Sequence, residues 1–150
     1  MLRLAISIAL AFLLVSPMVA DAQDQRISVS VSHTGEDNVG QRLAFALREV
    51  VRSSAGYRLV DAREATFRVS LVTLDPERSQ SAAGSWTTAA VTVTVRNTHP
   101  FNSSNPQTWY PIHLSTAIVL AGANKAEDQA KGILASLDAS IEDYKRDFRR

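Results

Sequence analysis

The sequence predicts an α+β fold, a two-layer sandwich in which two helices cover one face of a mainly antiparallel sheet of about five strands. Four segments alternate apolar and polar residues with a period of two, which is typical of strands that bury one face. Two other segments carry their apolar residues along a single helical stripe. The expected order is β-α-β-β-β-β-α. Because each helix has one apolar stripe, the simplest packing places both stripes on the apolar face of one sheet.

The first two elements are a strand and a helix. Residues 26–33 (RISVSVSH) alternate strictly, so every second side chain faces the core. Residues 38–54 place Val, Leu and Ala side chains on one helical stripe, and Phe45 lies on the opposite side. We expect Thr34 and Asp37 to form the N-cap of this helix, because such side chains accept hydrogen bonds from the free N–H groups of the first turn.

Four strands are expected to follow. Residues 57–60 form a short strand, and residues 66–74 and 86–96 alternate cleanly. Residues 108–121 form the last strand, and Pro111 places one end of it at a sheet edge because proline cannot donate to a ladder. The inward-facing side chains expected in this last strand are Tyr110, Ile112, Leu114, Ile118 and Leu120.

A long helix closes the chain. Asn124 and Glu127 resemble the start of a capping box. The last turn is rich in Lys and Arg, which suits the negative end of a helix dipole. The expected apolar stripe consists of Ala130, Ile133, Leu134, Leu137, Ile141, Tyr144 and Phe148.

The N-terminus has the layout of a cleavable secretory signal peptide. Arg3 precedes the apolar run 4–15, and a small-x-small cleavage site ends at Ala22. The run is too short for a membrane-spanning helix, which needs about 20 apolar residues. We therefore expect residues 1–22 to be removed, with cleavage after Ala20 as the alternative.

Composition narrows the expected function. Residues 23–150 have the usual size of a single α+β domain, and the chain has a formal net charge of +1 at pH 7. A nearly neutral protein has no bulk electrostatic reason to bind nucleic acid. There is no second apolar stretch of membrane length, and no Cys for disulfides or lipid attachment. We expect a periplasmic or secreted protein without a membrane span after cleavage.

The sheet face away from the helices is the first candidate binding surface. Arg58, Arg68 and Arg96 could contact carboxylates or phosphates of a polysaccharide or a partner protein, with Thr94 and His113 beside them. The same residue types are also ordinary choices for the wet side of an antiparallel sheet. The full set expected there is Ser28, Ser30, Arg58, Arg68, Ser70, Thr88, Thr92, Thr94, Arg96, His113 and Ser115.

An aromatic loop is the second candidate. Phe101, Trp109 and Tyr110 fall in or beside residues 97–107, which are rich in Asn, Ser and Pro. Exposed aromatic side chains mark binding surfaces. They can equally fold a long loop against the end of the sheet.

No residue pattern assigns a reaction, a metal or a cofactor. His33, His99 and His113 lack metal-ligand spacing, and neither a G-x-S-x-G elbow nor a phosphate-binding glycine loop is present. One enzymatic alternative remains, a small periplasmic hydrolase with a site around His33, Glu36 and His113. It requires the sheet to bring these side chains together.

The order of elements resembles the N-terminal domain of the TolB protein and the LptE-type fold of small envelope modules. The resemblance is carried by the RISVSVSH strand, the helix through residues 43–51 and the GYRLVD segment that follows it. It implies a binding or adaptor module of the bacterial cell envelope, whose partner and oligomeric state it leaves open. No β-propeller follows in this sequence. An oligomer formed through edge strands or through the open sheet face is a third possibility.

Overall fold

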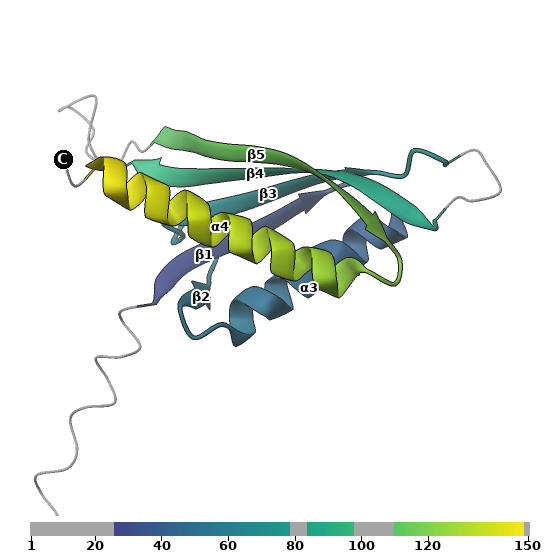
Figure 1. The fold of residues 1–150 in the computed structure, drawn as a ribbon, viewed down its shortest axis with the longest axis horizontal. Helices are drawn as coiled ribbons and strands as arrows, with labels where there is room; N and C mark the ends of the chain where they lie inside the picture. Colours follow the sequence, from purple (N-terminus) through teal and green to yellow (C-terminus); the bar gives the residue numbers. More distant parts are fainter. Residues whose placement is uncertain (1–25, 79–83, 98–109, 149–150) are drawn as a thin grey trace, which may run out of the picture.

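The computed structural model describes residues 26–78, 84–97 and 110–148. Their order is the predicted β-α-β-β-β-β-α (Figure 1). The elements are β1 (Ile27–Thr34), α3 (Asn38–Ser53), β2 (Tyr57–Leu59), β3 (Phe67–Leu74), β4 (Trp86–Asn97), β5 (Tyr110–Gly122) and α4 (Ala126–Phe148).

The strands form one five-stranded sheet in the order β2-β1-β3-β4-β5. β1 is parallel to both of its neighbours, whereas β3, β4 and β5 are antiparallel and form the longer ladders. Both helices lie on the same side of this sheet (Figure 1). The predicted α+β fold, with two helices on one face of a mostly antiparallel sheet, is therefore confirmed.

The core lies between the sheet and the two helices. The stripes predicted from helical spacing supply it, because their large side chains meet the inward-facing valines and leucines of the strands. Burying such side chains is the main favourable contribution to folding in a chain without disulfides. The most deeply buried large aliphatic side chains are Val29, Val39, Leu43, Leu47, Val51, Val69, Leu71, Leu137 and Ile141.

Two aromatic side chains of the sheet, Tyr57 on β2 and Phe67 on β3, contact α4. The hydroxyl of Tyr57 on β2 donates a hydrogen bond to Asp138 on α4. Burial raises the pKa of this hydroxyl, and the hydrogen bond and the negative charges of Asp138 and Glu142 raise it further. Phe67 and Tyr144 meet edge to face, with ring centroids 6.1 Å apart.

The predicted start of α3 is confirmed, but one predicted capping residue of each helix lies outside its cap. Thr34 belongs to β1, and Asp37 alone caps α3 by accepting a hydrogen bond from the amide of Gly40. α4 begins at Ala126, and Asn124 lies in the turn before it. α3 therefore begins where the predicted range begins, at Asn38, and only α4 begins later than its predicted capping residue implies.

The predicted inward face of β5 is wrong for its second half. Val93 of β4 pairs with Ser115 but Thr94 pairs with His113, so Leu114 is an extra residue in β5. A bulge of this kind reverses which side chains face the core. Ile112 remains packed against the core, but beyond Leu114 the residues that share its side of the sheet are Ser115, Ala117, Val119 and Ala121. Ile118 and Leu120 consequently point away from the helices.

The predicted signal peptide, residues 1–22, lies outside the described residues. Within the described part, neither helix has an apolar stretch of the length needed to cross a membrane.

Replacement of Leu137 by Asp should prevent folding. Leu137 is fully buried between α4 and the sheet, so the variant places a charge in the core at a cost of about 4 kcal/mol or more. Circular dichroism and urea unfolding measure the effect. Ala135→Asp, at an exposed position of the same helix, is the matched control and should fold. A folded Leu137→Asp protein would contradict the assigned helix face.

Candidate functional site

The outer face of the sheet, away from the helices, is divided into a covered part and an open part. The connection between β2 and β3 crosses β1 on this side. Arg68 donates a hydrogen bond to the carbonyl of Ala62, and Arg96 donates to the carbonyl of Arg63 at 2.9 Å. Ser28 lies 2.9 Å from Thr66, measured between the two hydroxyl oxygens. Two of the three predicted ligand-binding arginines thus hold this connection in place.

The remaining predicted binding residues do not gather in one site. Arg58 is exposed on β2, at one edge of the sheet, whereas His113 is exposed on β5 at the other edge. Thr94 joins Arg68 and His113 in one row across β3, β4 and β5. The Nε2 atom of His113 lies 2.8 Å from the hydroxyl oxygen of Thr116, so this ring has a partner on its own strand.

The aromatic candidate is only partly described. Tyr110 is the first residue of β5 and is exposed. Phe101 and Trp109 lie outside the described residues, so Tyr110 alone of the three is placed on the surface.

The open part of the outer face carries an apolar patch, which we call the outer patch: Val72, Leu74, Ile118 and Leu120. These side chains are between 56% and 68% exposed. Register places Val72, Ala90 and Ile118 in one row across three strands, and Leu74, Thr88 and Leu120 in the row beside it. Four large aliphatic side chains therefore share one uncovered area of the sheet.

Sequence reasoning missed both halves of the outer patch, for different reasons. Val72 and Leu74 alternate with the buried residues Phe67, Val69 and Leu71 of β3, so strict alternation is a usable signal for their outward direction. Ile118 and Leu120 gave no such signal. Their direction depends on the bulge, which only pairing with β4 reveals.

A polar cluster lies on the helix side of the sheet, where β1 and β3 end near the start of α3. The Nε2 atom of His33 is 2.8 Å from the hydroxyl oxygen of Thr73. Thr73 in turn donates to Asp37 at 2.6 Å, and Asp37 also accepts from the amide of Gly40. A Cβ atom added at Gly40 would lie 2.2 Å from the Thr73 hydroxyl oxygen, so only glycine fits there.

These contacts change the ionisation of Asp37. Burial alone disfavours the carboxylate and would raise its pKa, but hydrogen bonds from Thr73, the Gly40 amide and Thr87 outweigh burial. The pKa of Asp37 is consequently lowered from its ordinary value of 3.8. The cluster therefore contains a carboxylate that is stabilised in its charged form at neutral pH.

The polar cluster borders a hollow of about 350 Å³ lined in part by Glu36, Asp37 and Thr73, but it offers no free hydroxyl group that could act as a nucleophile. The Thr73 hydroxyl is bonded on both sides and the residue is only 5% exposed, so it is not presented to a substrate. Glu36 is exposed and pairs with Arg78 at 3.3 Å. His113 lies on the opposite face, with β3 and β4 between its strand and that of His33. The predicted grouping of His33, Glu36 and His113 is therefore not formed.

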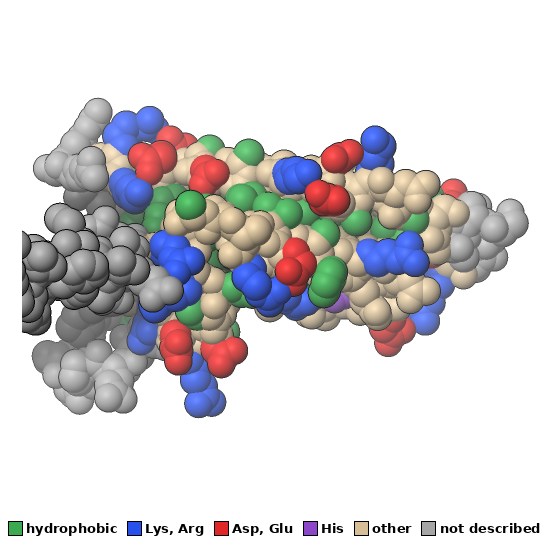
Figure 2. Space-filling view, turned by 90° about the horizontal axis from the view of Figure 1, so that it is seen from below, with side chains coloured by type: hydrophobic (Ala, Val, Ile, Leu, Met, Phe, Trp, Pro, Cys, Tyr) green, Lys and Arg blue, Asp and Glu red, His purple; other side chains and the backbone are tan. Residues whose placement is uncertain are grey.

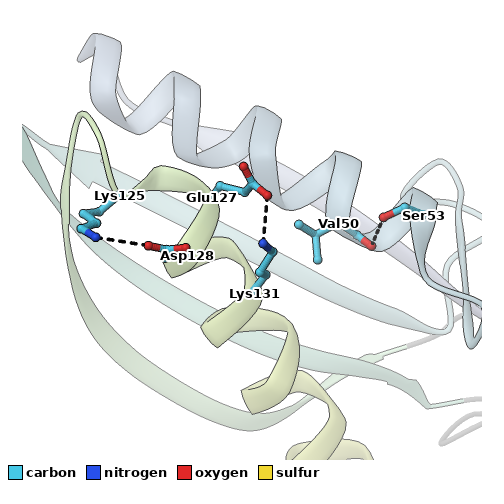
Figure 3. Close-up of polar contacts among 6 residues, drawn as sticks. All are labelled: Val50, Ser53, Lys125, Glu127, Asp128 and Lys131. Atoms are coloured by element: carbon cyan, nitrogen blue, oxygen red, sulfur yellow. Dashed lines mark hydrogen bonds and ion pairs between the residues drawn. The ribbon is translucent and has the colours of Figure 1, made fainter.

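A third feature is a hollow of about 640 Å³ between α3 and the start of α4. Phe45, 64% exposed, and Val50 supply its apolar lining from α3. The ion pair between Glu127 and Lys131, 2.9 Å long, lies on the α4 side (Figure 3). Figure 2 shows apolar side chains exposed among charged ones in the view from below. A single exposed aromatic ring bordered by solvated ion pairs needs no functional explanation.

No protein-family model matches this chain, and no curated protein matches it. Among the described residues, no group of three or more His, Asp and Glu side chains is placed to hold a metal ion. Of the described surface features, the outer patch is the one whose residues, four exposed aliphatic side chains, share a single chemical type.

Replacement of Asp37 by Asn should remove part of the acid sensitivity of the fold. Because the folded-state pKa of Asp37 is below 3.8, its carboxylate stabilises the protein above that pH. This contribution is lost as the pH falls through the folded-state pKa. Asp37→Asn should lower the free energy of unfolding by about 1 kcal/mol at pH 7 and flatten its decrease below pH 4. Urea unfolding at several pH values measures both effects.

Asp143→Asn, at an exposed ion pair with Arg146, is the control for that measurement. It should leave the acid profile close to that of the unaltered protein, because solvent-exposed pairs contribute little. Identical profiles for Asp37→Asn and the unaltered protein would show that the cap network does not depend on the charge.

Proposed function

We propose that this protein is an exported, non-enzymatic binding or adaptor module of the bacterial cell envelope, and that the outer patch binds a partner protein. The observation that carries the proposal is the exposure of four large aliphatic side chains in two adjacent rows of the sheet. Contiguous apolar area of this kind on a protein surface marks an interaction site.

The chemistry of the patch favours an apolar protein surface as its partner. The neighbouring row consists of Ser70, Thr92 and Thr116, so no charged side chain interrupts the three rows. A polysaccharide or phosphate ligand would instead need free cationic groups. Arg68 and Arg96, which the sequence offered for that purpose, donate hydrogen bonds to backbone carbonyls.

The enzymatic alternative has less support. A hydrolase needs a nucleophile or an activated water beside a general base, in a space that a substrate can enter. His33 and His113 lie on opposite faces of the sheet. The hydroxyl closest to His33 belongs to a buried threonine that already donates to Asp37.

The export part of the proposal rests on the N-terminal sequence. The short basic start, the apolar run and the small-x-small site are the three parts of a secretory signal.

Photo-crosslinking tests the outer patch. A photoreactive residue at Ile118 or Leu120, introduced into the chain in living bacteria, should give one discrete adduct because these side chains are exposed at the centre of the proposed interface. The same probe at Ala135, exposed on α4, is the matched control and should give none. Immunoblotting and mass spectrometry identify the adduct.

The double variant Ile118→Ser, Leu120→Ser should then lose the adduct formed by a probe at Val72, while its melting temperature stays close to that of the unaltered protein. Both replaced side chains are largely exposed, so little core packing is removed. Absence of any adduct from Val72, Ile118 and Leu120 would contradict the proposal.

Cell fractionation and intact-mass measurement test export. The protein should be recovered from the periplasm or the medium with Gln23 as its first residue, or with Asp21 if cleavage follows Ala20. A cytoplasmic protein that retains Met1 would show that the N-terminal segment is not a signal peptide.

A further inference from the structure

Strand β5 has the properties of an edge that accepts another strand. It lies at the end of the strand order and, among the described residues, pairs only with β4. Its 13 residues include no Lys, Arg, Asp or Glu. Edge strands in soluble proteins are usually protected by such charges, because their unpaired N–H and C=O groups invite pairing with another chain. Pro111 and the bulge at Leu114 protect only the first part of β5.

An apolar slot runs beside this edge, between β5 and α4. Its volume is about 260 Å³. Ala117 lies on the helix side of β5 yet is exposed, so α4 does not cover this part of the strand. The described side chains and backbone that line the slot are Val91, Val93, Ser115, Ala117, Val119, Gln129, Gly132, Ile133 and Ser136.

Small residues on α4 keep the slot open. Gly132 borders it, and a Cβ atom added there would meet no other atom within 4 Å. Glycine in the middle of a helix is less favourable than alanine by roughly 1 kcal/mol, so the helix forgoes stability at this position. Ser140 of α4 lies 2.8 Å from Ser115 of β5, measured between hydroxyl oxygens, and this contact joins the helix to the strand near the slot.

We propose that β5 binds an extended segment of a partner protein as an additional strand, and that an uncharged, aliphatic side chain of this segment enters the slot between β5 and α4. Backbone hydrogen bonds to the edge would supply affinity, and the slot would select the side chain, as in other cases of strand addition. Alternate side chains of the added strand would lie on the outer face, next to Ile118 and Leu120.

The dimensions of the slot favour a different protein over a second copy of this chain. A cavity of about 150 Å³ already accommodates a benzene ring, so the slot takes at least one large aliphatic side chain. A second β5 paired at this edge would offer Ser115, Ala117 and Val119 from the corresponding side, so none of its side chains there is as large as leucine. The slot lining contains no charged side chain, which excludes charged occupants on desolvation grounds.

Peptide titration followed by NMR tests the proposal with the exported protein labelled with ¹⁵N. The probes are nine-residue peptides in which Thr alternates with Leu, Val, Ala or Asp, with a lysine at each end for solubility. The Leu and Val peptides should shift the amide signals of Ala117, Val119 and Gly132 and slow hydrogen exchange along β5. The Ala and Asp peptides should bind at least about tenfold more weakly.

Gly132→Leu is the decisive variant, because the added side chain would fill the open space at the slot. It should weaken binding of the Leu peptide by about tenfold or more, while raising the stability of α4. Ala135→Leu adds a leucine at an exposed position of the same helix and should bind the peptide normally. Equal binding by the two variants, or no shift with any peptide, would overturn the proposal.

This inference goes beyond the outer patch, and the two can fail separately. Protection of β5 amides that grows with protein concentration, together with a doubled mass in light scattering, would assign the edge to a second copy and overturn the proposed partner. Loss of peptide binding in Gly132→Leu while the Ile118 adduct persists would support separate sites on one strand. An adduct at Ile118 without any peptide binding would leave the outer patch as the binding surface and refute strand addition.

Discussion

A single extra residue in β5, Leu114, determines which side chains the second half of this strand presents on each face of the sheet. Side chains alternate strictly along a strand, so the bulge at Leu114 reverses every position after it. It turns Ile118 and Leu120 to the outer face and leaves the smaller Ala117 on the helix side, beside the slot. Without the bulge, the two large aliphatic residues would fill that slot and the outer patch would lose half of its members. The β5 half of the outer patch and the open slot therefore follow from one local irregularity of backbone pairing.

The parallel position of β1 explains why only one end of the outer face is open. Because β2 and β3 flank β1 and run in the same direction, the chain between them must cross β1. The crossing lies on the face without helices, where Arg68 and Arg96 hold its carbonyl groups. The uncovered area is thus limited to β3, β4 and β5. On the helix side of the sheet, the polar cluster of His33, Thr73 and Asp37 joins the start of α3 to β1 and β3.

The exposed aliphatic side chains of the outer patch can still contribute free energy to binding, whereas those of the core are already buried in the folded protein. Each aliphatic side chain of the outer patch leaves more than half of its surface in water, and burial of such a side chain in a partner would contribute roughly 1 kcal/mol or more. The edge of β5 adds backbone groups that water now satisfies and that a partner strand would satisfy instead. An adaptor that presents a patch and an adjacent edge can recognise both the side chains and the backbone of one extended segment.

The sequence by itself determined the order of the elements, the faces of both helices and the alternation of β3 and β4, because these depend on spacing within one segment. The same alternation carried a signal for the outward direction of Val72 and Leu74, although the predicted open face did not include them. The strand order, the covered arginines, the reversed half of β5 and the His33–Thr73–Asp37 contacts depended on tertiary structure. These features arise from pairing between residues far apart in the chain, and periodicity carries no record of which strand lies beside which. Alternation already placed His113 on the outer face, but only the strand order showed that β3 and β4 separate it from His33.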